Sequence, residues 1–279
     1  MAFLVLLLVL LFETFSNWRL HIQQDRFWLR LLTRVEGRPR LTAAPWLSLA
    51  LLVLLPVLLL GLVLVALHPL AYGWLALPVH LLVLIYSLGR GDVQTSLGPF
   101  RDAWRRGDSQ AAYLVAERDL ALEVPDGDAL LERVQEYLLW QAYQGFFAVI
   151  FWYALLGPVA ALAYRLLALT DEHAQVESLR ERAVRLRHVF DWLPARLLAA
   201  SFGLVGNFIA VSRVLLHELL SRDVTAAKLV GDAGRAASEV PGETLGGEAG
   251  VRSLDELWQL LVRAAVLWYA AIALLVLLA

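Results

Sequence analysis

The 279-residue sequence has no cysteine, and only one of its 24 basic residues, Lys228, is a lysine. Without cysteine, neither a disulfide nor a thiolate metal site can form. The lone lysine lies in AAKLVGD rather than in a GxxxxGK[ST] sequence, so there is no P-loop. The segment HELLS begins like the zinc-binding HExxH motif but ends in Ser221, and no GxSxG elbow occurs. The common signatures of soluble enzymes and metal sites are therefore missing.

Charge is also scarce, at 18% of residues, and the net charge is −2. Nucleic-acid binding depends on a basic surface, so we expect no nucleic-acid partner. The six histidines are dispersed, which argues against a metal site. No segment of 20–50 residues repeats along the chain, so a solenoid is excluded too.

Apolar residues are abundant instead, at 59% of the chain, and the mean hydropathy is +0.63. A spanning helix needs about 20 mostly apolar residues. Suitable runs without Asp, Glu, Lys or Arg cover residues 46–67, 70–88, 146–164 and 264–279, and the second of them contains His80. The sequence predicts an all-α polytopic integral membrane protein with about four to five membrane helices and cytoplasmic amphipathic helices.

The N-terminal part, residues 1–45, is predicted as a membrane-associated helix followed by an arginine-rich cytoplasmic segment. Residues 1–15 lack a basic region before the apolar run and lack a cleavage site, so we expect a retained helix, short for a full span. Arginines close to spans mark the cytoplasmic side. Those of this segment are Arg19, Arg26, Arg30, Arg34, Arg38 and Arg40.

The next segments follow from that orientation. Residues 46–88 are predicted as a transmembrane hairpin, residues 89–142 as a cytoplasmic helical loop, and residues 143–169 as a transmembrane helix. Two paths are open for this last helix. It crosses fully and leaves residues 170–195 outside, or Gly157-Pro158 breaks it and returns the chain to the cytoplasmic side. The full crossing is the preferred interpretation.

The C-terminal part is predicted as three segments. Residues 170–230 form a charged helix and then an apolar helix, which either packs or is re-entrant. Residues 231–262 form a flexible linker, because GDAGRAASEVPGETLGGEAG has too few apolar residues to offset its ordering entropy. Residues 263–279 form the C-terminal transmembrane helix.

A set of polar residues surrounds the start of the third span and forms the candidate ligand site. The members found directly from the sequence are Asp108, Arg118, Asp119, Glu136, Gln141 and Gln144. Gln141 and Gln144 are three residues apart and therefore share one helix face. The structural alternative is an interfacial helix end with an aromatic belt, and a local Arg118-Asp119 ion pair.

Several segments in this order resemble the AmpE family, inner-membrane proteins encoded beside the AmpD amidase in Gram-negative bacteria. They are LVLLLVLLFE, WRLHIQQDRFWLRLL, the LLW before the third span, FWYALLGPVAALAYR and DWLPARL. The resemblance covers nearly the whole chain. It implies a sensory protein that modulates β-lactamase induction in connection with cell-wall recycling.

The AmpE family is in turn similar to the CobD/CbiB proteins, membrane enzymes of cobalamin synthesis that form an amide with ATP. This resemblance adds Tyr164, Arg165 and Arg196, which fall on the Y[KR] and PARL elements of that family. Where those enzymes carry acidic and amide residues, this chain has Trp140, Gln141 and Gln144, and the NTLDSM element is missing. Amides cannot neutralise magnesium, so the resemblance implies a kept scaffold and lost ligase chemistry.

The favoured function is a non-catalytic regulator without a cofactor, in the Gram-negative inner membrane, in contact with lipid and binding an anionic ligand such as a muropeptide or nucleotide. The alternative is an amide-forming enzyme that uses ATP and magnesium, held by Asp108, Asp119 and Glu136. A transporter is disfavoured, because the spans hold few ionisable groups and no repeat. The oligomeric state stays open.

Overall fold

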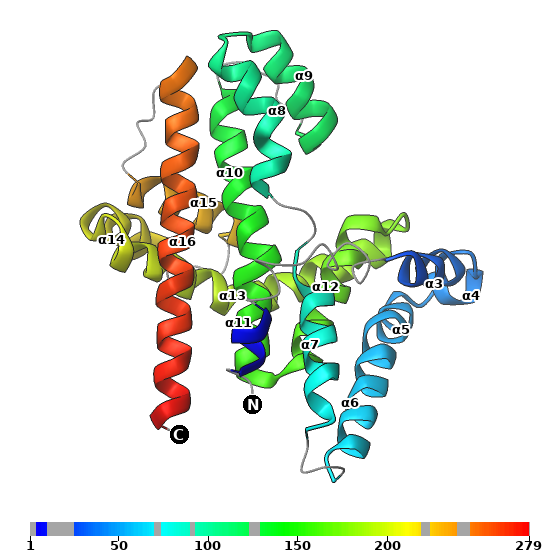
Figure 1. Ribbon diagram of the computed structural model, residues 1–279. Helices are drawn as coiled ribbons and strands as arrows, with labels where there is room; N and C mark the ends of the chain where they lie inside the picture. Colours follow the sequence, from blue (N-terminus) through cyan, green and yellow to red (C-terminus); the bar gives the residue numbers. More distant parts are fainter. Residues whose placement is uncertain are drawn as a thin grey trace. The chain divides into compact units, whose positions relative to one another are not determined.

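The computed structural model describes residues 4–9, 25–69, 74–89, 93–122, 129–218, 224–238 and 246–278, and none of these lies in a strand (Figure 1). The chain divides into two compact units. Unit 1 comprises Met1–Arg90 and Ala148–Asp191, and unit 2 comprises Gly91–Phe147 and Trp192–Ala279. The predicted all-α fold is confirmed.

Among the described residues, three helices are long and apolar enough to cross a membrane: Pro45–Leu67, Leu130–Leu156 and Gly247–Leu278. A shorter apolar helix covers Ala76–Ser87. Within the first span, Leu58, Leu62 and Val65 are more than half exposed, as expected of a surface that faces lipid rather than water. These spans, together with the all-α fold, make the chain a membrane protein. Of the predicted N-terminal helix, residues 4–9 are helical and residues 10–24 lie outside the described part.

Unit 1 begins with short surface helices and continues into the first spans. Proline starts two of these helices, at the first helical position, where its missing N–H costs no hydrogen bond. The elements are α3 (Arg26–Glu36), α4 (Pro39–Thr42), α5 (Pro45–Leu49), the π-helix η1 (Ala50–Leu54), α6 (Leu55–Leu67), α7 (Ala76–Ser87), α11 (Ala148–Leu156), α12 (Pro158–His173) and the part of α13 (Glu177–Val205) up to Asp191.

The core of unit 1 joins the amphipathic helix α3 to α12 and α13. Trp28, Leu32 and Val35 are spaced four and three residues apart, so they share one helix face, and all three are buried. They cluster with residues of η1 and α12 such as Leu52 and Leu169. The indole N–H of Trp28 also donates to the carbonyl of Leu52 at 3.4 Å.

The helix predicted over residues 143–169 is not continuous. Gly157 has φ 77°, a conformation that favours glycine, and Pro158 begins α12. Helix α12 then packs against α11 and α7. After α12, the backbone N–H groups of Gln175 and Val176 donate to Glu36 Oε1 at 2.8 and 3.1 Å. The structure therefore differs from the preferred full crossing, because the chain returns to the arginine-rich segment.

Unit 2 is built around α10 and α16, which pack against each other. Gln135 of α10 donates to the hydroxyl of Ser253 at 2.9 Å, and Phe147 meets Trp268 edge to face at 5.3 Å. The elements are α8 (Val93–Arg105), α9 (Ser109–Leu120), α10 (Leu130–Ala142), the π-helix η4 (Tyr143–Phe147), the end of α13, α14 (Phe208–Glu218), α15 (Ala226–Ala237) and α16 (Gly247–Leu278).

The predicted flexible linker over residues 231–262 needs correction, since most of it is helical. Residues 231–237 belong to α15 and residues 247–262 belong to α16, while residues 239–245 lie outside the described part. Thr225 caps α15 by accepting from the N–H of Lys228 at 3.3 Å. Leu229, Val230 and Ala233 are fully buried. Tertiary packing of this narrow apolar face against α10 outweighs the weak helix propensity of its glycines.

Candidate functional site

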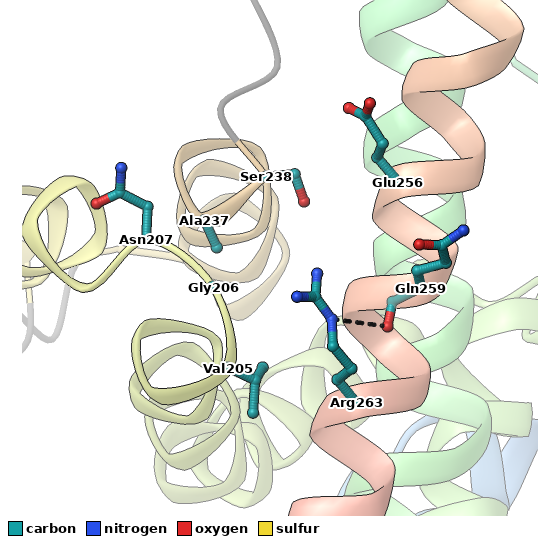
Figure 2. A pocket seen from close by; sticks show the side chains of 8 residues that line it. All are labelled: Val205, Gly206, Asn207, Ala237, Ser238, Glu256, Gln259 and Arg263. Atoms are coloured by element: carbon teal, nitrogen blue, oxygen red, sulfur yellow. Dashed lines mark hydrogen bonds between the residues drawn. The ribbon is translucent and has the colours of Figure 1, made fainter.

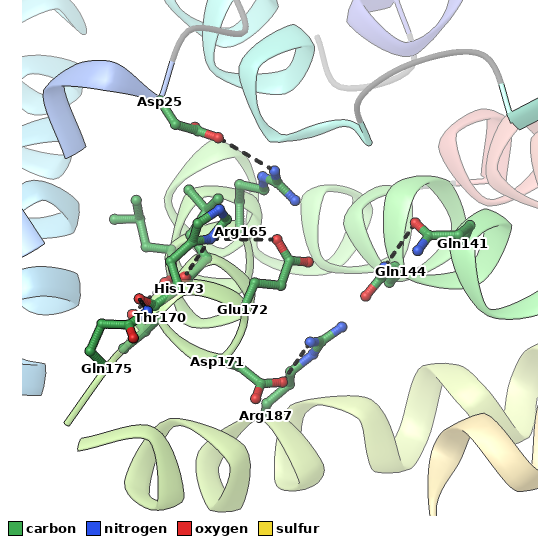
Figure 3. A network of polar contacts seen from close by, with 12 residues as sticks. Asp25, Gln141, Gln144, Arg165, Thr170, Asp171, Glu172, His173, Gln175 and Arg187 are labelled. Atoms are coloured by element: carbon green, nitrogen blue, oxygen red, sulfur yellow. Dashed lines mark hydrogen bonds and ion pairs between the residues drawn. The ribbon is translucent and has the colours of Figure 1, made fainter. Parts of the chain in front are cut away.

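A buried network of polar and charged side chains lies between α12 and α13 in unit 1, and Figure 3 shows two of its members, Asp171 and Arg187. The Tyr164 hydroxyl donates to Asp191 Oδ1 at 2.8 Å. Arg187 Nη1 donates to Asp171 Oδ2 at 2.8 Å, and its Nε lies 3.6 Å from Asp191 Oδ2. Tyr164, Arg187 and Asp191 are each at most 6% exposed. We call these four residues the Arg187 network.

The network balances a buried cation against two carboxylates. Burial opposes the charge on Arg187, but neighbouring Tyr164, Asp191 and Asp171 outweigh it, so the pKa of Arg187 lies above its ordinary value. The guanidinium is therefore charged at any accessible pH. Such an arrangement holds α12 against α13. Removing any one charged member would destabilise the fold, because the remaining charges would be left buried without a partner.

A second buried cation, Arg165, follows Tyr164 on α12. It is 8% exposed, and its Nη2 lies 3.9 Å from Asp25 Oδ2, the carboxylate that precedes α3 (Figure 3). Tyr86 of α7 donates to the other oxygen of Asp25 at 3.1 Å. Arg165 Nε has no hydrogen-bond partner in the described part of the chain. A guanidinium offers five N–H donors, so Arg165 has unused capacity to bind an anion.

Glu136, predicted as a ligand residue, lies in unit 2 beside arginines of two helices. Arg133 Nη1 donates to Glu136 Oε2 at 3.1 Å, and Arg235 Nη2 of α15 lies 3.6 Å from its other oxygen. Arg235 also contacts Glu132 and pairs with Asp232 at 2.8 Å. Burial opposes the Arg235 charge, but its hydrogen bonds to Asp232 and Glu132 outweigh it and raise the pKa of Arg235. Glu136 thus belongs to an ion-pair network between α10 and α15.

The two predicted glutamines contact each other, as their spacing suggests. Gln144 Nε2 donates to Gln141 Oε1 at 2.9 Å (Figure 3). Arg196, on α13, is 6% exposed, lies over the Trp192 ring at 4.3 Å and donates to the Trp192 carbonyl at 2.9 Å. The Gln141–Gln144 contact joins the end of α10 to η4, and Arg196 contacts a residue one turn earlier on α13.

The remaining predicted residues lie on α9. Asp108 is the N-cap, and its Oδ1 accepts from the N–H of Ala111 at 2.9 Å. Arg118 donates to both oxygens of Asp119, at 2.7 and 2.8 Å, and its side chain is 74% exposed. This hydrogen bond to Arg118 is the main reason that the pKa of Asp119 lies below its usual value. The geometry matches a local surface ion pair.

The chain is similar to known proteins over most of its length. The family model described as "Regulatory signalling modulator protein AmpE" matches residues 1–215. The chain belongs to the AmpE family. The Protein AmpE of Shigella flexneri is 27% identical over 216 residues, which cover 73% of this chain and 72% of that protein. No solved structure matches this chain significantly.

The AmpE match covers the Arg187 network, Arg165 and every predicted site residue, but it ends before α15 and α16. Arg235, which pairs with Glu136, therefore comes from beyond the matched region. The similarity to CobD/CbiB stays a prediction. In the described residues, no group of three or more histidine or acidic side chains is placed to hold a metal ion.

Five residues that form these buried contacts were not predicted from the sequence: Asp25, Tyr86, Asp171, Arg187 and Asp191. Charged residues are frequent in residues 171–191, and nothing in the sequence distinguishes the buried ones. One signal was available, because Arg187 and Asp191 are four residues apart and so form an ion pair on one helix face. Their burial depends on packing against α12, which the sequence does not encode locally.

Proposed function

We propose that this AmpE-family protein is a multi-pass inner-membrane regulator that modulates β-lactamase induction in connection with cell-wall recycling, and that it acts by binding rather than by catalysis. The observation that carries this proposal is the match to a family of regulatory signalling modulators over residues 1–215. The three helices able to cross a membrane support the location.

The proposed signal is an anionic small ligand, a muropeptide or a nucleotide. Both classes carry carboxylate or phosphate groups, which a guanidinium binds through paired, charge-assisted hydrogen bonds. Arg165 suits this role better than the exposed Arg118, because Arg165 is buried and its Nε has no hydrogen-bond partner among the described residues. Water competes less for a buried guanidinium.

Binding at Arg165 would compete with Asp25. The 3.9 Å separation of Arg165 Nη2 and Asp25 Oδ2 is longer than a hydrogen bond, so the ligand replaces a weak intramolecular partner. Asp25 precedes α3, and its release alters how α3 is held to α12 and α7. A ligand that favours one of two conformations in this way shifts their populations, which is what a transducer requires.

The test measures β-lactamase activity after exposure to a β-lactam in cells that lack the gene and carry a plasmid copy. We expect the wild-type copy to restore normal induction. Arg165→Lys keeps the charge but loses the planar pair of donors, and we expect it to fail. Arg180→Lys, on the same unit, is the matched control and should behave as wild type.

Binding is measured on the purified protein with a muropeptide and with ATP. We expect Arg165→Lys to weaken binding of one of them by about tenfold, since hydrogen bonds to charged groups are among the stronger ones. Equal affinities for Arg165→Lys and wild type contradict the assignment of the site. Magnesium-dependent ATP turnover that Glu136→Gln abolishes would instead establish the amide-forming alternative.

A further inference from the structure

Unit 2 contains a pocket that takes no part in the proposed function. It lies between the end of α13, the start of α14, the end of α15 and one face of α16, and its volume is about 340 Å³ (Figure 2). Its polar lining consists of Asn207, Ser238, Glu256, Gln259 and Arg263. We call it the α16 pocket.

Two groups in the α16 pocket can take a phosphate. Arg263 extends from α16 toward Ala237 and Gly206 (Figure 2). Apart from a 3.4 Å hydrogen bond from its Nε to the Gln259 carbonyl, it has no polar partner in the described residues. The Ser238 hydroxyl is buried and also has no hydrogen-bond partner among them. Its donor is therefore available to a phosphate oxygen that enters the pocket.

The pocket also holds a carboxylate. Glu256, Gln259 and Arg263 are spaced three and four residues apart, so they lie along one face of α16. Glu256 and Arg263 are separated by about 10 Å along the helix axis. Glu256 has no ion-pair partner in the described part of the chain. A ligand with a phosphate and an ammonium group matches both charges.

The position of the pocket on α16 indicates where that ligand comes from. Arg263 is the last charged residue of α16, and residues 264–278 are without formal charge. An arginine at such a boundary lies at the level of lipid headgroups. Leu204, Phe208 and Ile209, which flank the lining residues Val205–Asn207 in the sequence, are at least 64% exposed, and Val266, three residues after Arg263, is 64% exposed. Exposed apolar side chains next to a polar pocket fit a lipid, with its headgroup inside and its acyl chains outside.

We infer that the α16 pocket binds the headgroup of an ethanolamine phospholipid, with the phosphate at Arg263 and Ser238 and the ammonium group at Glu256. This site is independent of Arg165, which lies in unit 1, so the two proposals fail separately. It is a specific lipid site, distinct from general contact with the bilayer.

The experiment titrates the detergent-purified full chain with phosphatidylethanolamine and with phosphatidylglycerol, and counts bound lipids by native mass spectrometry. We expect tighter binding of phosphatidylethanolamine. Arg263→Gln should weaken it about tenfold, since one charge-assisted phosphate contact is lost. Arg252→Gln, an exposed arginine elsewhere on α16, is the matched control and should bind as wild type.

The Glu256→Gln variant tests the contact with the ammonium group separately from the contact with the phosphate. We expect it to remove the preference for phosphatidylethanolamine over phosphatidylglycerol while binding of phosphatidylglycerol persists. An unchanged preference overturns the placement of the ammonium group, and equal binding by Arg263→Gln and Arg252→Gln overturns the site. Soluble O-phosphoethanolamine that binds as tightly as the lipid would show that the free compound, rather than a phospholipid, is the ligand.

Discussion

Arg187 is the side chain on which the buried charges of unit 1 depend. Replacing it with alanine leaves Asp171 and Asp191 without their cation, and Asp191 is 3% exposed. We expect Arg187→Ala to lower the free energy of unfolding by about 3–5 kcal/mol, the usual cost of breaking a buried ion pair. The measurement is chemical unfolding in detergent, followed by circular dichroism.

Arg185 on the same helix is the control for this substitution. It pairs with Glu181 at 3.6 Å, and both side chains are more than half exposed. Arg185→Ala should cost only about 0.3–0.5 kcal/mol, as surface pairs on a helix do. If both variants lose the same stability, the Arg187 network does not hold α12 to α13.

The ion pair between Arg118 and Asp119 should make the titration of the Asp119 carboxyl depend on Arg118. The pKa of Asp119 is lower in the folded protein than in the unfolded chain. The ionised Asp119 carboxylate therefore stabilises the fold at a pH above its unfolded-state pKa, and this stabilisation is lost as the pH falls through its folded-state pKa. An NMR titration of the Asp119 carboxyl should give a midpoint below 3.8 in the wild type and near 3.8 in Arg118→Ala. Identical midpoints would show that the ion pair is absent in solution.

The close approach of α13 and α15 depends on a residue without a side chain. A Cβ atom on Gly206 would lie 2.7 Å from the carbonyl oxygen of Ala237, which is backbone and cannot rotate away. We expect Gly206→Ala to destabilise unit 2 by about 1–3 kcal/mol, as overpacking does. The midpoint of thermal unfolding in detergent measures this loss.

Gly231, in the middle of α15, is the matched control. A Cβ there would meet Glu136 Cγ at 3.6 Å, which is an ordinary contact. Gly231→Ala should therefore raise stability by about 0.5–1 kcal/mol, because alanine favours a helix more than glycine. A Gly206→Ala variant as stable as Gly231→Ala would contradict the close packing of α13 on α15.

Contacts within unit 1 predict on which side of the membrane its segments lie. Gln175 and Val176 contact Glu36, whereas His68 follows the far end of the span Pro45–Leu67. The chain has no cysteine, so single cysteines can report on each position. We expect Arg34→Cys and Gln175→Cys to react with an impermeant maleimide from the same side of a vesicle, and His68→Cys from the opposite side.

Labelling of Gln175→Cys from the His68 side would contradict this path and would restore the full crossing of residues 143–169. The outcome also bears on the positive-inside rule. The arginines of residues 170–195 conflict with an external location, and the return of α12 at Gly157 removes that conflict.

The break at Gly157-Pro158 was predictable from the sequence, but the path that the chain takes after it was not. Both residues disfavour a continuous helix, and the two possible paths were evident from them. The choice between the paths depends on α12 packing against α7 and α11, which are brought together by the fold. The same holds for the candidate site. The contact between Gln141 and Gln144 was predictable, because the two residues are three apart on one helix face. The pairing of Glu136 with Arg235 was not, because the two residues are about a hundred residues apart in the sequence.

By itself, the sequence determined the class of the protein, its apolar spans and its family, because hydropathy and short motifs are properties of contiguous segments. Only the tertiary structure decided which charges are buried, where the predicted linker becomes α15, and which side chains line the α16 pocket. Arg165 and Asp25 are 140 residues apart, and Arg187 reaches Asp171 from another helix. Burial and pairing at such separations depend on the packing of helices, which no single segment specifies.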